Sequence, residues 1–381
     1  MVHIIKGDLF NSTAQTLVNA VNCVGIMGKG LALEYRKRFP DMYDDYVPRC
    51  AAKQVRLGEP YVYQSRTLPW ILNFPTKKHW RAPSRLEDII SGLDHLETHY
   101  EEWGITSLAV PALGCGEGLL DWTIVGPILL QRLSRLEIPV ELYEPLSMIH
   151  HEDRHSFVRD GATSYNDLID AKPGHKRDSI RQVYPSHVAL VLAVDKIRQS
   201  PDHSPVGRTL FQMIAYFATV LGLPTGLRYV NGKYGPFAPE LKQITTKLIN
   251  NGLIYEDRVG RMIEIRVGPT YPQALKVYST PLVSWDPTIE RIVDLALRLD
   301  ITSAKTAVLA HYAAQNLANK LHIAPTESEV LASVTEQQRG RLTLTEESVA
   351  KTIRTLSSLG WLDVKSGADN HTVAGIKTVQ L

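Results

Sequence analysis

The sequence has few cysteines and no long apolar run, and both absences narrow the kinds of protein it can be. Three cysteines, Cys23, Cys50 and Cys115, occur in 381 residues, which is too few for a disulfide framework. No apolar stretch reaches the ~20 residues that cross a bilayer, and the N-terminus has no basic segment followed by an apolar signal core. We therefore expect a cytoplasmic protein without a membrane span.

The sequence also has no large excess of positive or negative charge, so net charge alone identifies no partner. The chain has 42 lysines and arginines against 40 aspartates and glutamates, a formal net charge of +2. No basic stripe of the kind that dominates nucleic-acid-binding domains is present. His150, His151 and His155 have no cysteine or carboxylate at zinc-site spacing, so we expect no metal site.

Two common phosphate-binding fingerprints are missing as well. A Walker A loop has serine or threonine after Gly-Lys, whereas Lys29 is followed by Gly30. A dinucleotide-binding fingerprint needs a third glycine at position 33, which is Leu33. The sequence therefore favours neither an ATPase nor a dehydrogenase.

What the chain does have is a pair of glycine-rich loops in matching positions. The first, at residues 22–33, follows the apolar run 16–21, and the second, at residues 111–118, follows the run 107–111. Each loop leads into a helical pattern, where glycines allow close approach and free backbone N–H groups favour an anion. One such loop is more often an ordinary tight turn, but two favour a cradle for a diphosphate.

Three motifs in this region resemble the macrodomain family, which binds ADP-ribose. They are Lys-Gly-Asp-Leu at residues 6–9, Asn-Ala-Val-Asn at 19–22 running into the first loop, and Pro-Ala-Leu-Gly-Cys-Gly at 111–116. Within that family, Phe-Pro-Thr-Lys-Lys-His-Trp at 74–80 and the second loop are most similar to the DNA ADP-ribosyl glycohydrolase antitoxins. The resemblance covers roughly the first 150 residues, about one domain.

The resemblance implies a role for individual residues around ADP-ribose. Asp8 matches the acidic residue that accepts a hydrogen bond from the adenine amino group, and Leu9 lies beside it in the adenine pocket. Asn22 would meet the distal ribose, and Tyr143 would stack near the adenosine. Two alternatives stay open, because Asp8 could simply cap a turn and Tyr143 could be an ordinary core residue.

The two loops would hold the diphosphate between them. The resemblance places the following residues against the ligand: Gly25, Met27, Gly28, Gly30 and Leu31 in the first loop, and Leu113, Gly114, Cys115, Gly116, Glu117, Gly118 and Leu119 in the second.

Lys77 is the residue that the resemblance makes catalytic. In related deADP-ribosylating macrodomains a Thr-Lys pair places an amine beside the anomeric carbon of the distal ribose, and Thr76 and Lys77 match that pair. A lysine attacks only when neutral, so we expect burial, and the adjacent cation Lys78, to lower its pKa. The alternative is a solvated pair of surface lysines.

The second loop departs from one macrodomain pattern. Relatives that act on protein carboxylates have an aspartate there, and the matching position in this chain is Gly118. Glu117 is adjacent, but we expect it to point elsewhere, and Asp121 is predicted to cap a helix that begins at Trp122. This pattern implies lysine-centred cleavage of ADP-ribose from a DNA base, thymine in the characterised systems, without a cofactor.

Apolar periodicity predicts the fold of residues 1–148. Strand-like runs at residues 2–5, 71–74 and 138–142 alternate with helical patterns, of which Ser84 to Glu87 forms a predicted capping box. A second run of apolar residues at helical spacing ends at Pro40, which cannot continue a helix. These runs predict an α/β fold, and the macrodomain resemblance implies a three-layer α/β/α sandwich with a mixed sheet.

The remainder of the chain is predicted to be mainly helical. Residues 149–182 are polar and turn-prone, which indicates a linker. Helices followed by paired strands predict a winged-helix-like module at 183–280 and a second one at 281–381. The first hairpin is expected at residues 251–267, and the second from residues 360–364 to a closing strand at 373–379.

The resemblance implies an antitoxin enzyme that removes ADP-ribose from thymidine in DNA. Its partners would be ADP-ribosylated single-stranded DNA as substrate and a DNA ADP-ribosyltransferase toxin of the DarT type, held by the helical region. We rank toxin binding by that region above independent DNA binding. The alternative is a non-catalytic ADP-ribose-binding module that sequesters a partner protein, and the missing loop carboxylate keeps that alternative open.

Overall fold

The protein forms two compact units. The computed structural model describes residues 1–145, 182–201, 205–232, 235–260, 262–338 and 345–365. The first unit comprises residues 1–191, 244–255 and 267–283, and the second comprises residues 192–243, 256–266 and 284–381.

A six-stranded sheet forms the centre of the first unit. Its strands lie in the order β1-β6-β5-β2-β4-β3, and all neighbours are parallel except β3 and β4. The predicted mixed sheet and the expected strands are therefore confirmed. The strands are β1 (Val2–Ile5), β2 (Thr16–Asn22), β3 (Tyr61–Tyr63), β4 (Trp70–Lys77), β5 (Leu108–Pro111) and β6 (Val140–Tyr143).

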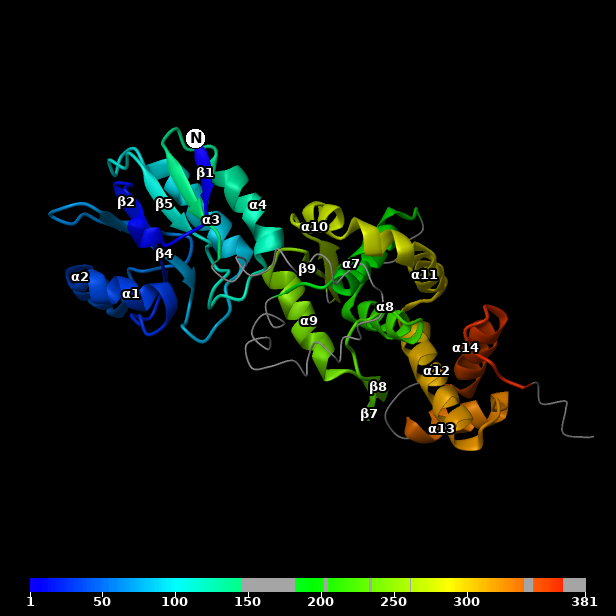
Figure 1. Cartoon of the computed structure of the whole chain (residues 1–381). Helices are drawn as coiled ribbons and strands as arrows, with labels where there is room; N and C mark the ends of the chain where they lie inside the picture. The colour runs from blue at the N-terminus through cyan, green and yellow to red at the C-terminus, as the bar shows by residue number, and fades with distance from the viewer. Residues whose placement is uncertain (146–181, 202–204, 233–234, 261, 339–344, 366–381) are drawn as a thin grey trace, which may run out of the picture. The chain divides into compact units, whose positions relative to one another are not determined.

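Helices cover both faces of this sheet, as the labels in Figure 1 show. Alternate residues of β2 point to opposite faces, so that Leu17 and Val21 join one core cluster and Val18 joins the other. The first cluster includes residues of α1 (Gly30–Arg38) and α2 (Pro40–Ala51), and the second includes residues of α3 (Leu86–His99) and α4 (Trp122–Leu133). Burial on both faces explains why the central strands are nearly continuous apolar runs.

The predicted helix starts are partly right. Asp121 caps α4, because its side chain accepts a hydrogen bond from the backbone N–H of Thr123. The capping box at Ser84 is wrong: α3 begins at Leu86, and its N-cap is Arg85, which makes no capping bond. Glu87 instead pairs with Arg85 at 2.8 Å, and the Ser84 side chain is buried.

Asp121 also joins the sheet region to later residues of the same unit. Its carboxylate accepts a hydrogen bond from the backbone N–H of Val183 at 2.7 Å, and its own N–H donates to Asn251 Oδ1 at 2.8 Å. The carboxyl group is buried, which raises its pKa, and Lys247 opposes that shift. The segment that precedes α4 is thus anchored by residues far along the chain.

The elements after the macrodomain-like region are mostly helical, as predicted. Within the second unit, the long helix α12 packs against α8, α13 and α14. These later elements are α7 (Pro185–Gln199), α8 (Arg208–Val220), β7 (Val230–Gly232), β8 (Gly235–Phe237), α9 (Pro239–Asn250), β9 (Ile254–Val259), β10 (Met262–Val267), α10 (Tyr271–Val277), α11 (Ser279–Arg298), α12 (Ile301–Leu321), α13 (Glu327–Gln337) and α14 (Glu346–Ser358). One short 3-10 helix, η1 (Leu9–Asn11), lies early in the chain.

The winged-helix interpretation of these elements is not confirmed. A helix, α9, is followed by the paired strands β9 and β10, as expected for the first module. In the second module, residues 360–364 form no strand, and only Lys365 makes an isolated bridge, with Thr326. Several predictions fall outside the described residues: the closing strand at 373–379, the histidines His150, His151 and His155, and most of the linker.

The described part of the chain includes no helix with both the length and the apolar character needed to span a bilayer.

Candidate active site

The predicted site residues converge on one edge of the sheet. Strands β1, β2, β4, β5 and β6 run parallel, so the segments that follow them emerge at the same edge. Asp8 follows β1, the first loop follows β2, Lys77 ends β4, the second loop follows β5, and Tyr143 ends β6. The carboxyl edge of a parallel sheet is where open α/β folds bind ligands.

The first loop is shaped by Asn22. Its side-chain oxygen accepts hydrogen bonds from the backbone N–H groups of Val24 at 3.0 Å and Ile26 at 3.4 Å, and its amide nitrogen donates to the carbonyl of Ile26 at 2.5 Å. The hydroxyl of Tyr46 donates to the carbonyl of Asn22 at 2.6 Å. Asn22 thus holds the loop closed, and its contact with the distal ribose stays a prediction.

The first loop ends at the start of α1, where an anion can be held. The N-cap of α1 is Lys29, whose side chain makes no capping bond, so no side chain of the cap satisfies the first N–H groups of the helix. Gly25 and Gly30 have φ angles of +79° and +56°, which only glycine adopts readily. Met27 is buried beneath the loop, whereas Gly28 is followed by the exposed start of the helix.

The second loop is a tight turn with its own hydrogen bonds. Leu119 donates to the carbonyl of Gly116 at 3.2 Å, and Leu120 donates to that of Gly114 at 3.0 Å. Gly114 has a φ of +76° and Leu119 a φ of +67°, which is rare for leucine and costs energy. Leu113 and Cys115 are buried under this turn.

Gly118 has no space for a side chain. A Cβ atom there would overlap the Ser84 hydroxyl and the carbonyl oxygen of Gly114. The backbone N–H of Ser84 also donates to the carbonyl of Gly118 at 2.9 Å, which fixes the two segments against each other. The loop therefore excludes a carboxylate at position 118. Sequence reasoning missed Ser84, because nothing local marks a contact made across 34 residues.

Lys77 pairs in the sheet with Asn22, where the first loop begins, and its side chain reaches the second loop. Its amine donates a hydrogen bond to the carbonyl of Glu117 at 2.8 Å, and a Cβ at Gly30 would lie 4.0 Å from Glu117 Cγ. Burial lowers the pKa of Lys77, and the carboxylate of Glu117 raises it. The expected lowering by burial is thus present, but the cation effect expected from Lys78 is not among its causes. Contrary to the expectation that Glu117 points elsewhere, its carboxylate interacts with Lys77 and raises the pKa of that lysine.

Thr76 has a structural contact. It is buried, and its hydroxyl donates to the carbonyl of Val21 at 3.3 Å, which ties the ends of β4 and β2 together. This bond helps to position Lys77, the next residue.

Asp8, Leu9 and Tyr143 lie together at the other end of the edge. Asp8 caps η1 by accepting a hydrogen bond from the backbone N–H of Phe10 at 3.0 Å, and Leu9 is buried. Tyr143 belongs to the core on the α1 and α2 face, its hydroxyl donates to Glu141 at 2.8 Å, and burial raises its pKa to about 12. The carboxylate of Asp8 adds to that shift. Both residues thus have the structural roles named as alternatives, and their contacts with adenosine stay predictions.

The fold and this edge define a class of protein. A mixed sheet between two helical layers has two glycine loops and a half-buried lysine at its carboxyl edge, and residues 18–129 match the Macro domain family. The protein is therefore a macrodomain protein, as the resemblance implied.

Comparison with known proteins identifies the family more narrowly. The chain is 34% identical over 274 residues to a protein of Thermus aquaticus named DNA ADP-ribosyl glycohydrolase, and the match covers 71% of this chain and 70% of that one. A Thermosipho africanus protein named as a DNA ADP-ribosyl transferase and DNA ADP-ribosyl glycohydrolase fusion is 43% identical over 161 residues, 38% of this chain and 42% of that one. The solved macrodomain of Mycobacterium tuberculosis DarG is 42% identical with a TM-score of 0.37, covering 38% of this chain and 98% of that structure.

The chain belongs to the DNA ADP-ribosyl glycohydrolase family. Its members are enzymes, so the identification places the lysine and the two loops in a hydrolase.

Proposed function

We propose that this protein removes ADP-ribose from thymidine in single-stranded DNA and neutralises the transferase toxin that adds it. The observation that carries the enzymatic part is Lys77, a half-buried amine with a lowered pKa that donates to the Glu117 carbonyl of the second loop, on a strand residue paired with Asn22 at the start of the first loop. Those loops offer N–H groups at a helix start to the diphosphate, so the distal ribose comes to lie beside the amine.

The reaction proceeds at the anomeric carbon of the distal ribose. The neutral amine of Lys77 bonds to that carbon while the glycosidic bond to the base nitrogen breaks, and the nitrogen takes up a proton. The resulting glycosylamine opens its ribose ring to an imine, and water then adds to the imine carbon, which frees ADP-ribose and restores the amine. Since the second loop excludes a carboxylate at Gly118, the lysine carries the step without one.

The direct test uses the full-length protein and an oligonucleotide with ADP-ribose on thymine. We expect release of unmodified DNA and free ADP-ribose, followed by gel shift and chromatography. Borohydride added during turnover should trap a covalent adduct on the peptide that contains Lys77. Tight binding of ADP-ribose without any release would favour the alternative, a module that binds ADP-ribose and sequesters a partner.

Removing the Glu117 charge should change the pH dependence of the reaction. The carboxylate stabilises the ammonium form of Lys77, so Glu117→Gln lowers the lysine pKa further and leaves the hydrogen bond to the Glu117 backbone carbonyl in place. A larger neutral fraction then exists at acidic pH. We expect the acidic limb of the single-turnover rate profile to move to lower pH, and to move less at high salt. A shift toward higher pH would contradict the proposal.

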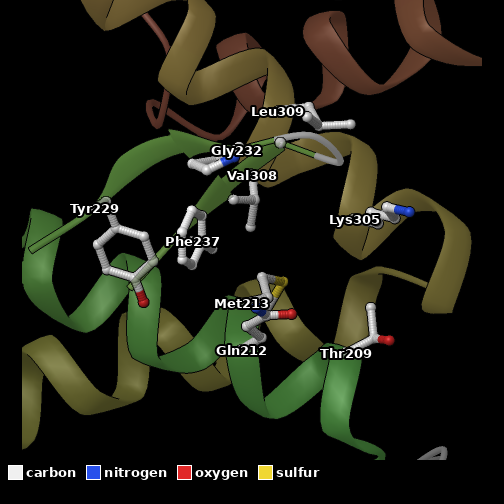
Figure 2. Close-up of a pocket in the computed structure, with 11 residues that line it drawn as sticks. Thr209, Gln212, Met213, Tyr229, Gly232, Phe237, Lys305, Val308 and Leu309 are labelled. Atoms are coloured by element: carbon white, nitrogen blue, oxygen red, sulfur yellow. The ribbon is translucent and has the colours of Figure 1, made fainter. Parts of the chain in front are cut away.

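The second unit is where we propose that the toxin binds. Support comes from the Thermosipho relative, whose name places a transferase and a glycohydrolase in one chain. The unit has a pocket of 520 Å³ between α8, the β7 and β8 hairpin and α12. Figure 2 shows Phe237 and Met213 near one another, with Thr209 and Lys305 to the right of them. This combination of an apolar interior and a cationic rim fits an apolar side chain of the toxin beside an acidic one.

Truncating the pocket rim should weaken toxin binding. Phe237 is 42% exposed and lines the pocket, so Phe237→Ala is expected to weaken binding of the transferase about 30-fold, the effect of losing an interface hot spot. Leu321→Ala is the matched control, because Leu321 is also 42% exposed, lies on α12 and does not line the pocket. Equal affinities for the two variants, measured by calorimetry, would place the toxin elsewhere.

A further inference from the structure

The segment immediately after Lys77 is exposed, aromatic and basic. Lys78, His79, Trp80 and Arg81 follow the end of β4, and all four are exposed. Trp80 is 42% exposed although indole is the largest apolar side chain. A solvated tryptophan next to a catalytic lysine calls for an explanation, because tryptophan is usually mostly buried.

This segment has a defined shape. The backbone N–H of Arg81 donates to His79 Nδ1 at 3.2 Å, and that of Ala82 donates to the carbonyl of His79 at 2.9 Å, which closes a turn. The rings of His79 and Trp80 are stacked, with centroids 5.6 Å apart and an interplanar angle of 28°. The Arg81 guanidinium lies 4.5 Å from the centroid of the Trp80 ring. The indole therefore packs against the His79 ring and the Arg81 guanidinium.

The positive charge of the segment is not neutralised locally. Within the described ranges of the chain, neither Lys78 nor Arg81 forms an ion pair, whereas the nearby Arg85 is paired with Glu87 at 2.8 Å. Unpaired cations beside a stacked aromatic ring form the combination that binds single-stranded nucleic acid, since the cations attract phosphates and the ring stacks on a base.

The position of the segment limits which part of a substrate it can reach. Trp80 is three residues beyond Lys77, so its backbone lies within about 11 Å of the lysine backbone. The two loops are assigned to the diphosphate of ADP-ribose, so the nucleotides on either side of the modified base need a further surface. Those nucleotides leave the site close to the reacting amine and carry phosphates and bases.

We propose that Lys78, Trp80 and Arg81 form the surface that binds the single-stranded DNA flanking the ADP-ribosylated base. Trp80 stacks on a neighbouring base, and the two cations contact the adjacent phosphates. The proposal rests on the proposed function, and it makes this segment the determinant of preference for DNA over an isolated nucleoside. Because stacking tolerates every base, it adds affinity with little sequence preference.

The test compares two substrates of the full-length protein: an oligonucleotide with ADP-ribosylated thymine at its centre, and ADP-ribosylated thymidine alone. For Trp80→Ala we expect the ratio of kcat/KM on the oligonucleotide to that on the nucleoside to fall about 10-fold, mainly through KM. Trp80→Phe should restore most of the ratio, because phenylalanine also stacks.

The charged residues have a separate readout. Arg81→Ala should reduce the dependence of log KM on log salt by about 0.7, the contribution of one contact to a single-strand phosphate. Arg66→Ala is the matched control, since Arg66 is exposed in the segment before β4, at the opposite end of that strand. An equal effect of both substitutions would show general charge attraction and overturn the assignment of Arg81.

Other outcomes of these measurements also test the proposed DNA-binding surface. An unchanged ratio for Trp80→Ala, or an equal loss on both substrates, would overturn the proposed surface while leaving the glycohydrolase activity in place. An unchanged ratio together with weaker toxin binding would assign the segment to the protein partner instead. Absence of cleavage of either substrate by the unmodified protein would instead remove the proposed function, and the inference with it.

Discussion

We expect Lys77→Ala to abolish release of ADP-ribose from DNA and to leave ADP-ribose binding nearly unchanged. The amine donates to the Glu117 carbonyl at 2.8 Å, and within the described residues it makes no other hydrogen bond or ion pair. Loss of a positioned reactive group lowers rates about 100- to 10,000-fold. We expect affinity to persist because, in the proposed function, backbone N–H groups hold the diphosphate. Single-turnover rates at saturating DNA, and calorimetry with ADP-ribose, measure the two effects.

Two further variants define the role of the lysine. Lys77→Arg keeps a positive charge that cannot be removed, so it should be as inactive as alanine if the neutral amine reacts. Retained activity would show that the side chain acts only as an orienting cation. Lys37→Ala is the control for a lost lysine, because Lys37 is exposed on α1 and paired with Glu34.

Gly118→Ala should destabilise the second loop and prevent ADP-ribose binding. The new methyl group would overlap both the Ser84 hydroxyl and the Gly114 carbonyl, and the carbonyl cannot move without breaking its bond to Leu120. Overpacking of this kind costs about 2 to 3 kcal/mol. Chemical unfolding measures the stability change, and calorimetry measures the affinity. Unchanged stability would mean that the loop adapts, and our account of the missing carboxylate would be wrong.

The same loop provides a matched control. A Cβ at Gly116 would meet no atom within 4 Å, and its φ is not in the left-handed region, so Gly116→Ala should change stability by less than about 0.5 kcal/mol. Ser84→Ala combined with Gly118→Ala should recover only part of the loss, because the Gly114 carbonyl still obstructs the methyl group.

The position of the site could be predicted from the sequence, because it depends on local order along the chain. An apolar run, a glycine loop and a helical pattern in succession place each loop at the carboxyl end of a strand, and the ends of parallel strands meet at one edge. The capping of α4 by Asp121 was predictable for the same reason. Lys77 came from a motif that resembles a family, not from periodicity.

Contacts between distant residues could not be predicted. Ser84 and Gly118 are 34 residues apart, and Lys77 and Glu117 are 40 apart, so no local pattern reports either pair. The capping box at Ser84 had the right residue types, but tertiary packing buried that serine against the second loop and moved the helix start to Leu86. The helical region shows the same limit, since its helices and one hairpin were predictable, but the winged-helix arrangement predicted for them is not confirmed.

The sequence by itself therefore determined the α/β order of the first 145 residues, the positions of the two glycine loops and the motif on which the proposed role of Lys77 rests, since each depends on residues close together in the chain. Only the tertiary structure decided the lowering of the Lys77 pKa by burial, the opposing influence of Glu117 and the exclusion of a carboxylate at Gly118. The physical reason is that burial, steric overlap and Coulomb interactions depend on distances in space, and these exist only after the strands have come together.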